Sequence, residues 1–311
     1  MQNKLMEGKK MFQAKMYWIH ALSSLHVGSG RGVGFIDLPI IRERVTNWPF
    51  VPGSSIKGVL SDHYGASKIE DRQKTPNLRA AFGIADNDGS TANSGSLVFS
   101  DARIVCFPVR SFFGTFAWTV SPLLLSRLKR DLKYIGLKDQ DTLPDKIKIE
   151  NGSVIVVNDS VLVEQNKVYL EDLDFTVQAC DNADKLAGKL AEWIFSGDPV
   201  WQAEFKKRFA ILPDDVFNFL SETGTEVNAR IRIEPDKKLA AEHALWYEEA
   251  LPAETILSGI VWCDRVFGGD ETASINNLME AYCANEVPLQ LGGNATTGKG
   301  RVRCIFSNGG N

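Results

Sequence analysis

The sequence predicts an α+β fold, and three features of the chain carry that prediction. Strand-like and helix-like segments alternate irregularly, neighbouring strand-like segments lie close enough to pair antiparallel, and nothing repeats at a fixed period. No linker rich in proline, glycine or serine divides the 311 residues. We therefore expect a single domain over residues 1–311, with one core sheet and large insertions.

The N-terminal part of the chain supplies a strand, a helix and a second strand. Residues 16–25 carry the mixed apolar pattern of a buried strand. The segment PGSSIKGVL predicts a helix that is capped by Ser54 or Ser55 and packs on the sheet, with Lys57 projecting away from that face. Residues 94–109 follow as the second strand.

The middle of the chain predicts another helix and two insertions. Ser121 is the expected cap of the helix, which Gly136 ends. Residues 137–181 contain short β runs joined by turn signals, and we expect a protruding, thumb-like hairpin there. We expect residues 182–240 to form a helical insertion. The remaining expected elements are helices at 183–196, 213–222 and 272–284, and strands at 226–235, 244–252, 254–264 and 300–307.

Composition restricts the classes of protein that the chain can belong to. The five cysteines are scattered, odd in number and without a Cys-x-x-Cys pair, which supports neither a disulfide framework nor a zinc ribbon and indicates a reducing compartment. No segment has the apolar length of a signal peptide core or of a membrane span. We expect a cytoplasmic protein with no membrane partner.

Two glycine-rich segments are basic although the chain as a whole carries a net charge of −4. Residues 26–58 contain four cations and two acids, and residues 289–303 contain three cations and no acid. A helix N-terminus with two hydroxyls, PGSSIKG, adds a third element that suits an anion. Each element alone is compatible with an ordinary surface loop, but the three together favour a polyanionic ligand.

Neither glycine-rich segment fits a standard nucleotide motif. GSGRGVG lacks the third glycine of the dinucleotide-binding pattern. GNATTGKG resembles a phosphate loop, but Gly300 stands where the magnesium-binding hydroxyl is required, and a strand follows where a helix is required. The sequence therefore argues against a nucleotide hydrolase and leaves two flexible basic loops.

Several residues have both a catalytic and a structural interpretation. Asp37 can accept N–H bonds in a turn, or it can ligate a divalent ion or orient a ribose hydroxyl for attack on the adjacent phosphorus. His26 can act as a general base or a phosphate donor, or it can be a structural histidine. Glu248 and Glu249 lie in a predicted strand, where only one of two successive side chains is expected to face inward.

These segments resemble a known family. LHVGSGRGVGFIDLPIIRERVTNWPFVPGSSIKGVL resembles the N-terminal signature of the RAMP superfamily of CRISPR proteins, and LGGNATTGKGRV is similar to its C-terminal glycine-rich loop. Together with FPVRSFFGTFAWTVSPLLLSRLKRD and LWYEEALPAET, they look like the backbone subunit of the type III-B (Cmr) effector complex.

The resemblance implies a ferredoxin-like (RRM-like) palm with a β-hairpin thumb. It further implies copies of the chain that polymerise head to tail along a guide (CRISPR) RNA with other Cmr subunits. Such subunits cleave the paired target single-stranded RNA at regular intervals with a divalent metal, Mg²⁺ or Mn²⁺. Two alternatives remain open: a non-catalytic RNA-binding scaffold, and the equivalent type III-A subunit or a guide-processing nuclease of the same superfamily.

The resemblance also assigns site residues. Asp37 corresponds to the catalytic, metal-binding acid, and His26, which matches a position near the guide, joins it among the expected catalytic residues. Glu248 and Glu249 fall in a motif where the family has catalytic helpers, and which of the two assists stays open. The residues expected to bind RNA are Arg31, Arg42, Ser54, Ser55, Lys57, Gly292, Gly293, Lys299 and Arg301.

Overall fold

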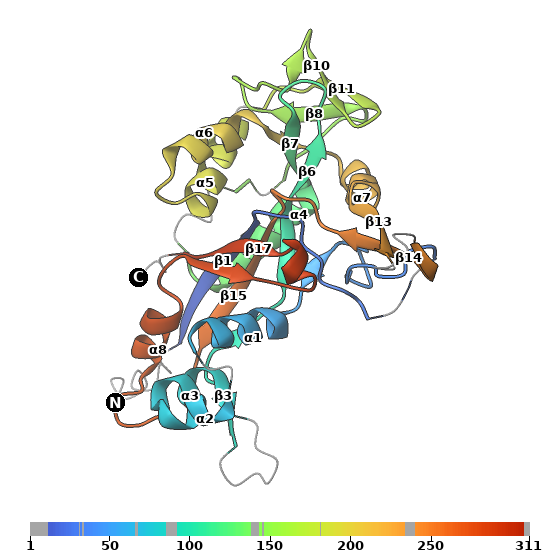
Figure 1. The fold of residues 1–311 in the computed structure, drawn as a ribbon. Coiled ribbons are helices and arrows are strands. Elements are labelled where there is room, and N and C mark those ends of the chain that lie inside the picture. Colours follow the sequence, from blue (N-terminus) through green and yellow to red (C-terminus); the bar gives the residue numbers. More distant parts are fainter. Residues whose placement is uncertain are drawn as a thin grey trace, which may run out of the picture.

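The computed structural model describes residues 12–307 except 31, 33, 66–67, 85–91, 138–142, 145, 181 and 234–239. The described residues form a mixed α+β structure (Figure 1), as the sequence predicted. Most of their buried apolar side chains make one contiguous cluster. The division of the chain into one domain with two insertions stays a prediction.

Four antiparallel strands make the centre of the sheet, in the spatial order β17, β1, β15, β6. They are β1 (Gln13–Ala21), β6 (Ala102–Arg110), β15 (Ile256–Cys263) and β17 (Arg301–Phe306). Both faces of β1 are covered, since Trp18 stacks on Trp193 while Tyr17 packs edge-on against Phe99 on the opposite side. This double burial explains why the strand lacks a simple polar–apolar alternation.

The sheet continues on both sides of this centre. Beyond β17 lies β16 (Val287–Gln290), and β5 (Val98–Phe99) and β2 (Phe50–Val51) pair with β15 and β6. Beyond β6 the order is β7 (Phe116–Val120), β12 (Phe209–Ile211), β8 (Ser153–Val156), β11 (Leu173–Val177), β10 (Lys167–Leu170) and β9 (Val163–Glu164). The last four strands come from the predicted 137–181 insertion and form the upper end of the molecule in Figure 1. Gln165 and Asn166 make the turn between β9 and β10 with positive φ, as the Gln-Asn-Lys signal predicted.

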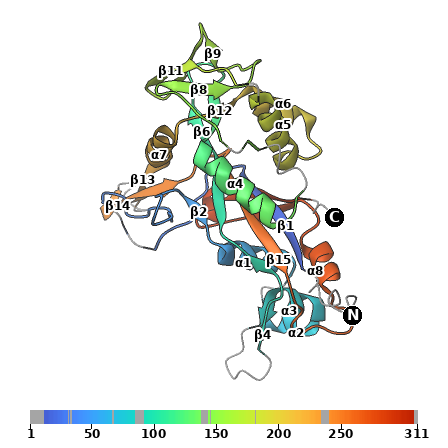
Figure 2. The ribbon, with the colours of Figure 1, turned by 180° about the vertical axis from the view of Figure 1, so that it is seen from behind.

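Helices cover both faces of the central strands. They are α1 (Gly53–His63), α2 (Ile69–Lys74), α3 (Pro76–Phe82), α4 (Pro122–Tyr134), α5 (Ala183–Ile194), α6 (Pro199–Lys207), α7 (Asp214–Thr223) and α8 (Ile275–Tyr282). Helix α1 lies in front of the sheet in Figure 1, and α4 lies on the opposite face, as Figure 2 shows. In sequence, α1 lies between β1 and β6, and α8 lies between β15 and β17.

Two short two-stranded sheets stand apart from the main one. β3 (Gly83–Ile84) pairs with β4 (Asn93–Ser94), and β13 (Glu226–Ile233) pairs with β14 (Ala240–Ala250). The β13–β14 hairpin projects to one side of the molecule (Figure 1), and its base is tied to the loop after β1 by the bridges Leu25–Leu251 and Leu38–Glu248.

The helix boundaries show which capping signals were interpreted correctly. The hydroxyl of Ser121 accepts a bond from the Leu124 N–H, so the predicted cap of α4 is confirmed. The predicted cap of α1 by Ser54 or Ser55 is wrong: the helix begins at Gly53, and the carboxylate of Asp101 accepts the Gly53 N–H at 2.9 Å.

The sequence interpretation also missed α2, α3 and α6. The start of α6 has a recognisable signal, because Asp198 precedes Pro199 and accepts the Trp201 N–H at 3.1 Å. Helix α3 likewise begins with a proline, Pro76.

Two glycines of α1 predict opposite effects of the same substitution. A Cβ atom on Gly53 would lie 2.3 Å from the carbonyl oxygen of Phe99, whereas a Cβ on Gly58 would meet open space. We expect Gly53→Ala to destabilise the protein by about 1–3 kcal/mol through overpacking. Gly58→Ala should stabilise it by about 0.5–1 kcal/mol, because glycine is a poor helix former. Urea unfolding of both variants tests this, and a neutral Gly53→Ala would contradict the close packing of α1.

Candidate active site and nucleic-acid interface

The two predicted glycine-rich segments lie side by side in the structure. The N–H of Gly293 donates to the carbonyl of His26 at 2.8 Å, and the N–H of Gly300 donates to the carbonyl of Ser24 at 2.8 Å. Gly292 adopts φ +75°, and a Cβ there would lie 2.1 Å from the His26 carbonyl oxygen. Glycine is therefore required for the C-terminal loop to approach the N-terminal one so closely.

Asp37 is solvent-exposed at the edge of this loop pair. Its Oδ2 accepts the backbone N–H of Tyr247 at 2.8 Å, and the next residue, Leu38, donates its N–H to the Tyr247 carbonyl at 3.0 Å. The ring of Phe35 meets that of Tyr247 edge-on at 6.3 Å. Asp37 therefore does accept an N–H bond, which is the structural role that the sequence allowed for it. This bond uses only one oxygen of the exposed carboxylate.

Glu249 holds the loop after β1 against β14. Its Oε1 accepts bonds from Arg42 at 2.6 Å and from the Thr225 hydroxyl at 2.9 Å, and its Oε2 accepts the Ile40 N–H at 3.0 Å. The side chain is buried. Arg42 also donates to the carbonyls of Asn47 and Ser221. Glu249 and Arg42 are thus engaged in internal contacts and do not face the open surface beside Asp37.

Glu248 is buried on the other side of the same strand. Its Oε1 lies 2.8 Å from the Lys299 ammonium, and its Oε2 lies 3.6 Å from Nε of Arg230. Burial opposes ionisation of Glu248, but the adjacent ammonium of Lys299, assisted by Arg230, lowers its pKa below the ordinary value. The prediction that only one of the two glutamates faces inward is wrong, because loops cover both sides of this end of β14.

His26 is buried beside the Glu249 carbonyl and the two glycine loops. Its Nδ1 lies 2.6 Å from the Glu249 carbonyl oxygen. A carbonyl can only accept, so Nδ1 carries the proton and Nε2 is the ring atom that remains to accept one. A Cβ on Gly28 would lie 3.1 Å from this Nε2, so the glycine loop closes directly over the imidazole.

Among the residues expected to bind RNA, the structure separates exposed groups from internally bonded ones. Lys299 is buried against Glu248, and the ammonium of Lys57 donates to the Leu97 carbonyl at 2.9 Å instead of projecting freely. The exposed or partly exposed candidates are Ser54, Ser55, Gly292, Gly293 and Arg301. Arg31 lies outside the described residues.

Sequence reasoning missed three contributors to the site: Arg230, Thr225 and Tyr247. Arg230 lies on β13, two residues from Asn228, which pairs directly with Glu248. Residues separated by two along a strand face the same side, so the pairing register of the hairpin was the signal that could have located it.

Neither a metal cage nor a membrane span is found in the part of the chain that the structure describes. No group of three or more His, Cys, Asp or Glu side chains is placed to hold a metal ion there. No described helix is long and apolar enough to cross a bilayer.

The contrast between Glu249 and Asp37 predicts different costs of removal. Glu249→Ala leaves the partly buried guanidinium of Arg42 without its carboxylate partner and should lower the free energy of unfolding by about 3–5 kcal/mol. Asp37→Ala removes one exposed hydrogen bond and should cost about 1 kcal/mol or less. Urea unfolding of the two variants compares them directly. Equal losses would mean that Asp37 is a structural residue.

Comparisons with known proteins find relatives over nearly the whole chain. Residues 18–303 match the RAMP superfamily. The chain is 34% identical over 304 residues to the CRISPR system Cmr endoribonuclease Cmr4 of Pyrococcus furiosus, a match that covers 96% of this chain and 98% of that protein. The crystal structure of oligomeric Cmr4 from the same organism aligns with a TM-score of 0.71 at 29% identity, over 96% of this chain and 99% of that one.

A more limited likeness links the chain to a second group of proteins. The CRISPR system Cms endoribonuclease Csm3 of Mycobacterium tuberculosis is 34% identical over 95 residues, which cover 27% of this chain and 38% of that protein. The match to Cmr4, by contrast, spans both proteins almost completely. The chain therefore belongs to the RAMP superfamily, and within it the full-length likeness is to Cmr4.

Proposed function

We propose that this protein is a backbone subunit of a type III-B CRISPR effector complex that binds guide RNA and cleaves paired target single-stranded RNA. The observation that carries the proposal is the exposed carboxylate of Asp37 beside two glycine-rich loops that meet around His26. The full-length similarity to a Cmr endoribonuclease supports it. Its partners are guide RNA, target RNA, further copies of this chain and other Cmr subunits, in the cytoplasm.

The central strands support a ferredoxin-like palm. Following the chain through β1, α1, β6, β15, α8 and β17 gives a βαββαβ succession, and the antiparallel spatial order is β17-β1-β15-β6. This is the connectivity of the split βαβ motif. The palm places the loop after β1 and the loop before β17 at one end of adjacent strands, which is where the two glycine-rich segments lie.

The chemistry proposed for Asp37 follows from its exposure. One carboxylate oxygen is held by Tyr247, which fixes the side chain, while the other can accept the proton of a ribose 2′-hydroxyl as that hydroxyl attacks the adjacent phosphorus. The leaving 5′-oxygen then takes a proton from solvent. Glu248 and Glu249 assist by positioning the loops, because both are occupied by internal partners.

The residues at this site could supply few of the ligands of a metal ion. Asp37 offers a single carboxylate, which suits Mg²⁺ or Mn²⁺ held mainly by RNA phosphate oxygens and water. Such an ion would stabilise charge that develops on the phosphate during cleavage.

Guide binding is proposed to use backbone groups more than side chains. Exposed Gly292 and Gly293 permit close approach of a phosphate chain, and Arg301 supplies an exposed charge next to them. Contacts of this kind do not read bases, which suits a carrier of guides with arbitrary sequence.

Two elements are candidates for the thumb that interrupts the duplex. The 137–181 insertion was predicted from its turns and forms the far end of the sheet. The β13–β14 hairpin contacts the Asp37 loop directly and exposes apolar side chains, including Ile231 and Leu245. The hairpin is therefore the better-placed element to displace a nucleotide next to Asp37.

Cleavage by an assembled complex tests the role of Asp37. We expect Asp37→Ala to assemble on guide RNA as the unmodified protein does and to cut target RNA at least about 100-fold more slowly, the usual contribution of a general base. The measurement is single-turnover cleavage of a labelled target. Unchanged cleavage at every site, with a lowered melting temperature, would instead support the non-catalytic scaffold.

Guide binding tests the role of Arg301. Arg301→Ala should weaken binding of all guide sequences alike and reduce the dependence of log K on log salt by about 0.7, the effect of one lost phosphate contact on a single strand. Arg265→Ala, an exposed arginine before α8, is the matched control. Fluorescence anisotropy at several salt concentrations measures both, and a loss confined to particular guide sequences would contradict phosphate contact.

A further inference from the structure

A rigid loop with an exposed valine at its tip projects near the N-terminal end of α4. We define it as the 43–47 loop, and its Val45 side chain is 96% exposed. Arg44, beside it, is exposed, and no ion pair to it is found in the part of the chain that the structure describes. The tip therefore presents an apolar group and a cation to whatever lies outside the molecule.

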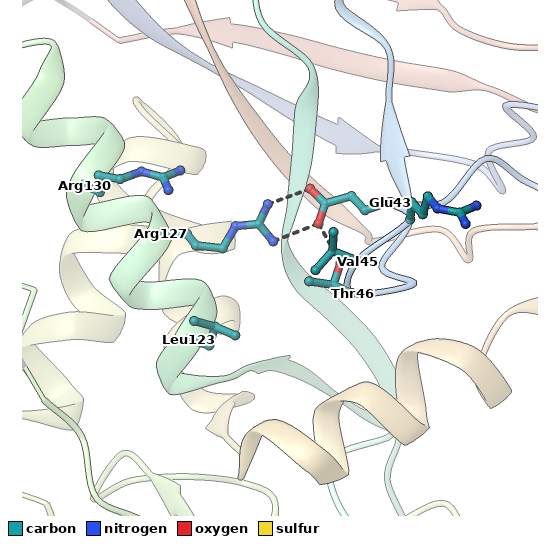
Figure 3. Close-up of a pocket in the computed structure, with 7 residues that line it drawn as sticks. Glu43, Val45, Thr46, Leu123, Arg127 and Arg130 are labelled. Atoms are coloured by element: carbon teal, nitrogen blue, oxygen red, sulfur yellow. Dashed lines mark hydrogen bonds and ion pairs between the residues drawn. The ribbon is translucent and has the colours of Figure 1, made fainter.

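Hydrogen bonds and an ion pair fix this loop in place. Both oxygens of Glu43 accept bonds from Arg127 of α4, at 2.6 and 2.9 Å, and Thr46 donates to the same carboxylate at 2.6 Å (Figure 3). The loop is closed by the bond from the Asn47 N–H to the Glu43 carbonyl. Burial alone would raise the pKa of Glu43. The bonds from Arg127 and Thr46 outweigh burial, so the pKa lies below its ordinary value and the carboxylate stays ionised. A loop held in one shape loses little conformational entropy when it docks.

The chain also carries a pocket with complementary chemistry at the far end of the sheet. We call it the aromatic pocket: a cavity of about 590 Å³ whose apolar lining includes Phe112, Phe113, Tyr169 and Leu173. The rings of Phe112 and Phe113 lie 5.1 Å apart, and Phe112 is 83% exposed. Large aromatic side chains that remain exposed around a cavity are typical of a binding surface.

Carboxylates surround the aromatic pocket. Glu171 and Asp174 are paired with Arg110 and Lys167. Glu164 and Asp172 also line the cavity, and no ion pair to either is found in the described part of the chain. This negative rim disfavours RNA phosphates and favours a ligand that combines an apolar group with a cation.

We propose that the 43–47 loop of one copy of this chain docks in the aromatic pocket of the next copy. Val45 enters between the aromatic rings, and Arg44 pairs with Glu164 or Asp172. The contact rests on the proposed self-assembly and assigns residues to it. Because loop and pocket are different surfaces of the same chain, each copy offers one of each, and the contact propagates head to tail.

Three variants test the docking. Val45→Asp disables the loop, Phe112→Asp disables the pocket, and Val200→Asp changes another strongly exposed valine, on α6, as the control. Sedimentation velocity measures self-association of each protein, first without RNA, and with a single-stranded guide RNA if the unmodified chain stays monomeric alone. We expect at least about tenfold weaker association for the first two variants and none of this loss for the control.

Mixing the variants distinguishes head-to-tail docking from other contacts. Val45→Asp keeps an intact pocket and Phe112→Asp keeps an intact loop, so an equimolar mixture should form heterodimers that cannot extend. Likewise, Arg44→Glu should regain association when its partner carries Glu164→Lys and Asp172→Lys. These two results together would support the assigned pairing.

Three outcomes count against the docking. Association of both variants at the level of the unmodified chain, or a mixture that stays monomeric, overturns the docking and leaves the proposed self-assembly standing. Failure of the unmodified chain to associate even on guide RNA contradicts the proposed backbone function, and the docking with it.

Discussion

The buried carboxylate of Glu249 is the interaction on which the geometry of the site depends. It accepts bonds from two segments that are distant in sequence: the loop after β1, through Ile40 and Arg42, and the residue just before β13, Thr225. Deleting one partner of a buried ion pair leaves an uncompensated charge and is strongly destabilising, whereas the intact pair is hardly more stabilising than an apolar contact of the same size. The pair therefore matters because it fixes one position of the loop after β1 against β14. Asp37 lies three residues before Ile40 in that loop, so the pair also fixes the position of Asp37.

A second buried pair closes the site from the opposite side. Lys299 approaches Glu248, the neighbour of Glu249, and brings the C-terminal loop onto the N-terminal one at His26. Two successive carboxylates of one strand thus bind two loops from its two sides. The loops themselves are free to consist largely of glycine, since side-chain contacts elsewhere hold them. Backbone that is both exposed and held in place is what recognition of a phosphate chain without base reading requires.

The sequence was sufficient for features that depend on local periodicity and capping. It predicted the strand that contains Trp18, the cap of α4 at Ser121 and the helix that ends near Tyr282, because burial and hydrogen bonding in those places are decided within one element. It was insufficient for Lys57, Arg42 and Lys299, which were interpreted as free cations. Each of them is engaged by a carbonyl or carboxylate from a distant element, and no local pattern reveals such a partner. Asp37 acquired its predicted role from the family resemblance, and the structure adds that its carboxylate is exposed.

Because these cations pair internally, few charges of this acidic chain remain for RNA phosphates. In the described parts of the two basic segments, Arg42, Lys299 and Arg303 are paired with Glu249, Glu248 and Glu286, which leaves Arg44 and Arg301 as the exposed arginines. Since affinity for a nucleic acid rises with the number of phosphates neutralised, we expect one copy of the chain to bind RNA weakly. Copies that contact one another along a single guide add their contributions, because each neighbour raises the effective concentration of the next. On this reasoning we expect tight binding to require assembly, and we expect the internal pairs that shape the site to keep a lone subunit from binding stray RNA.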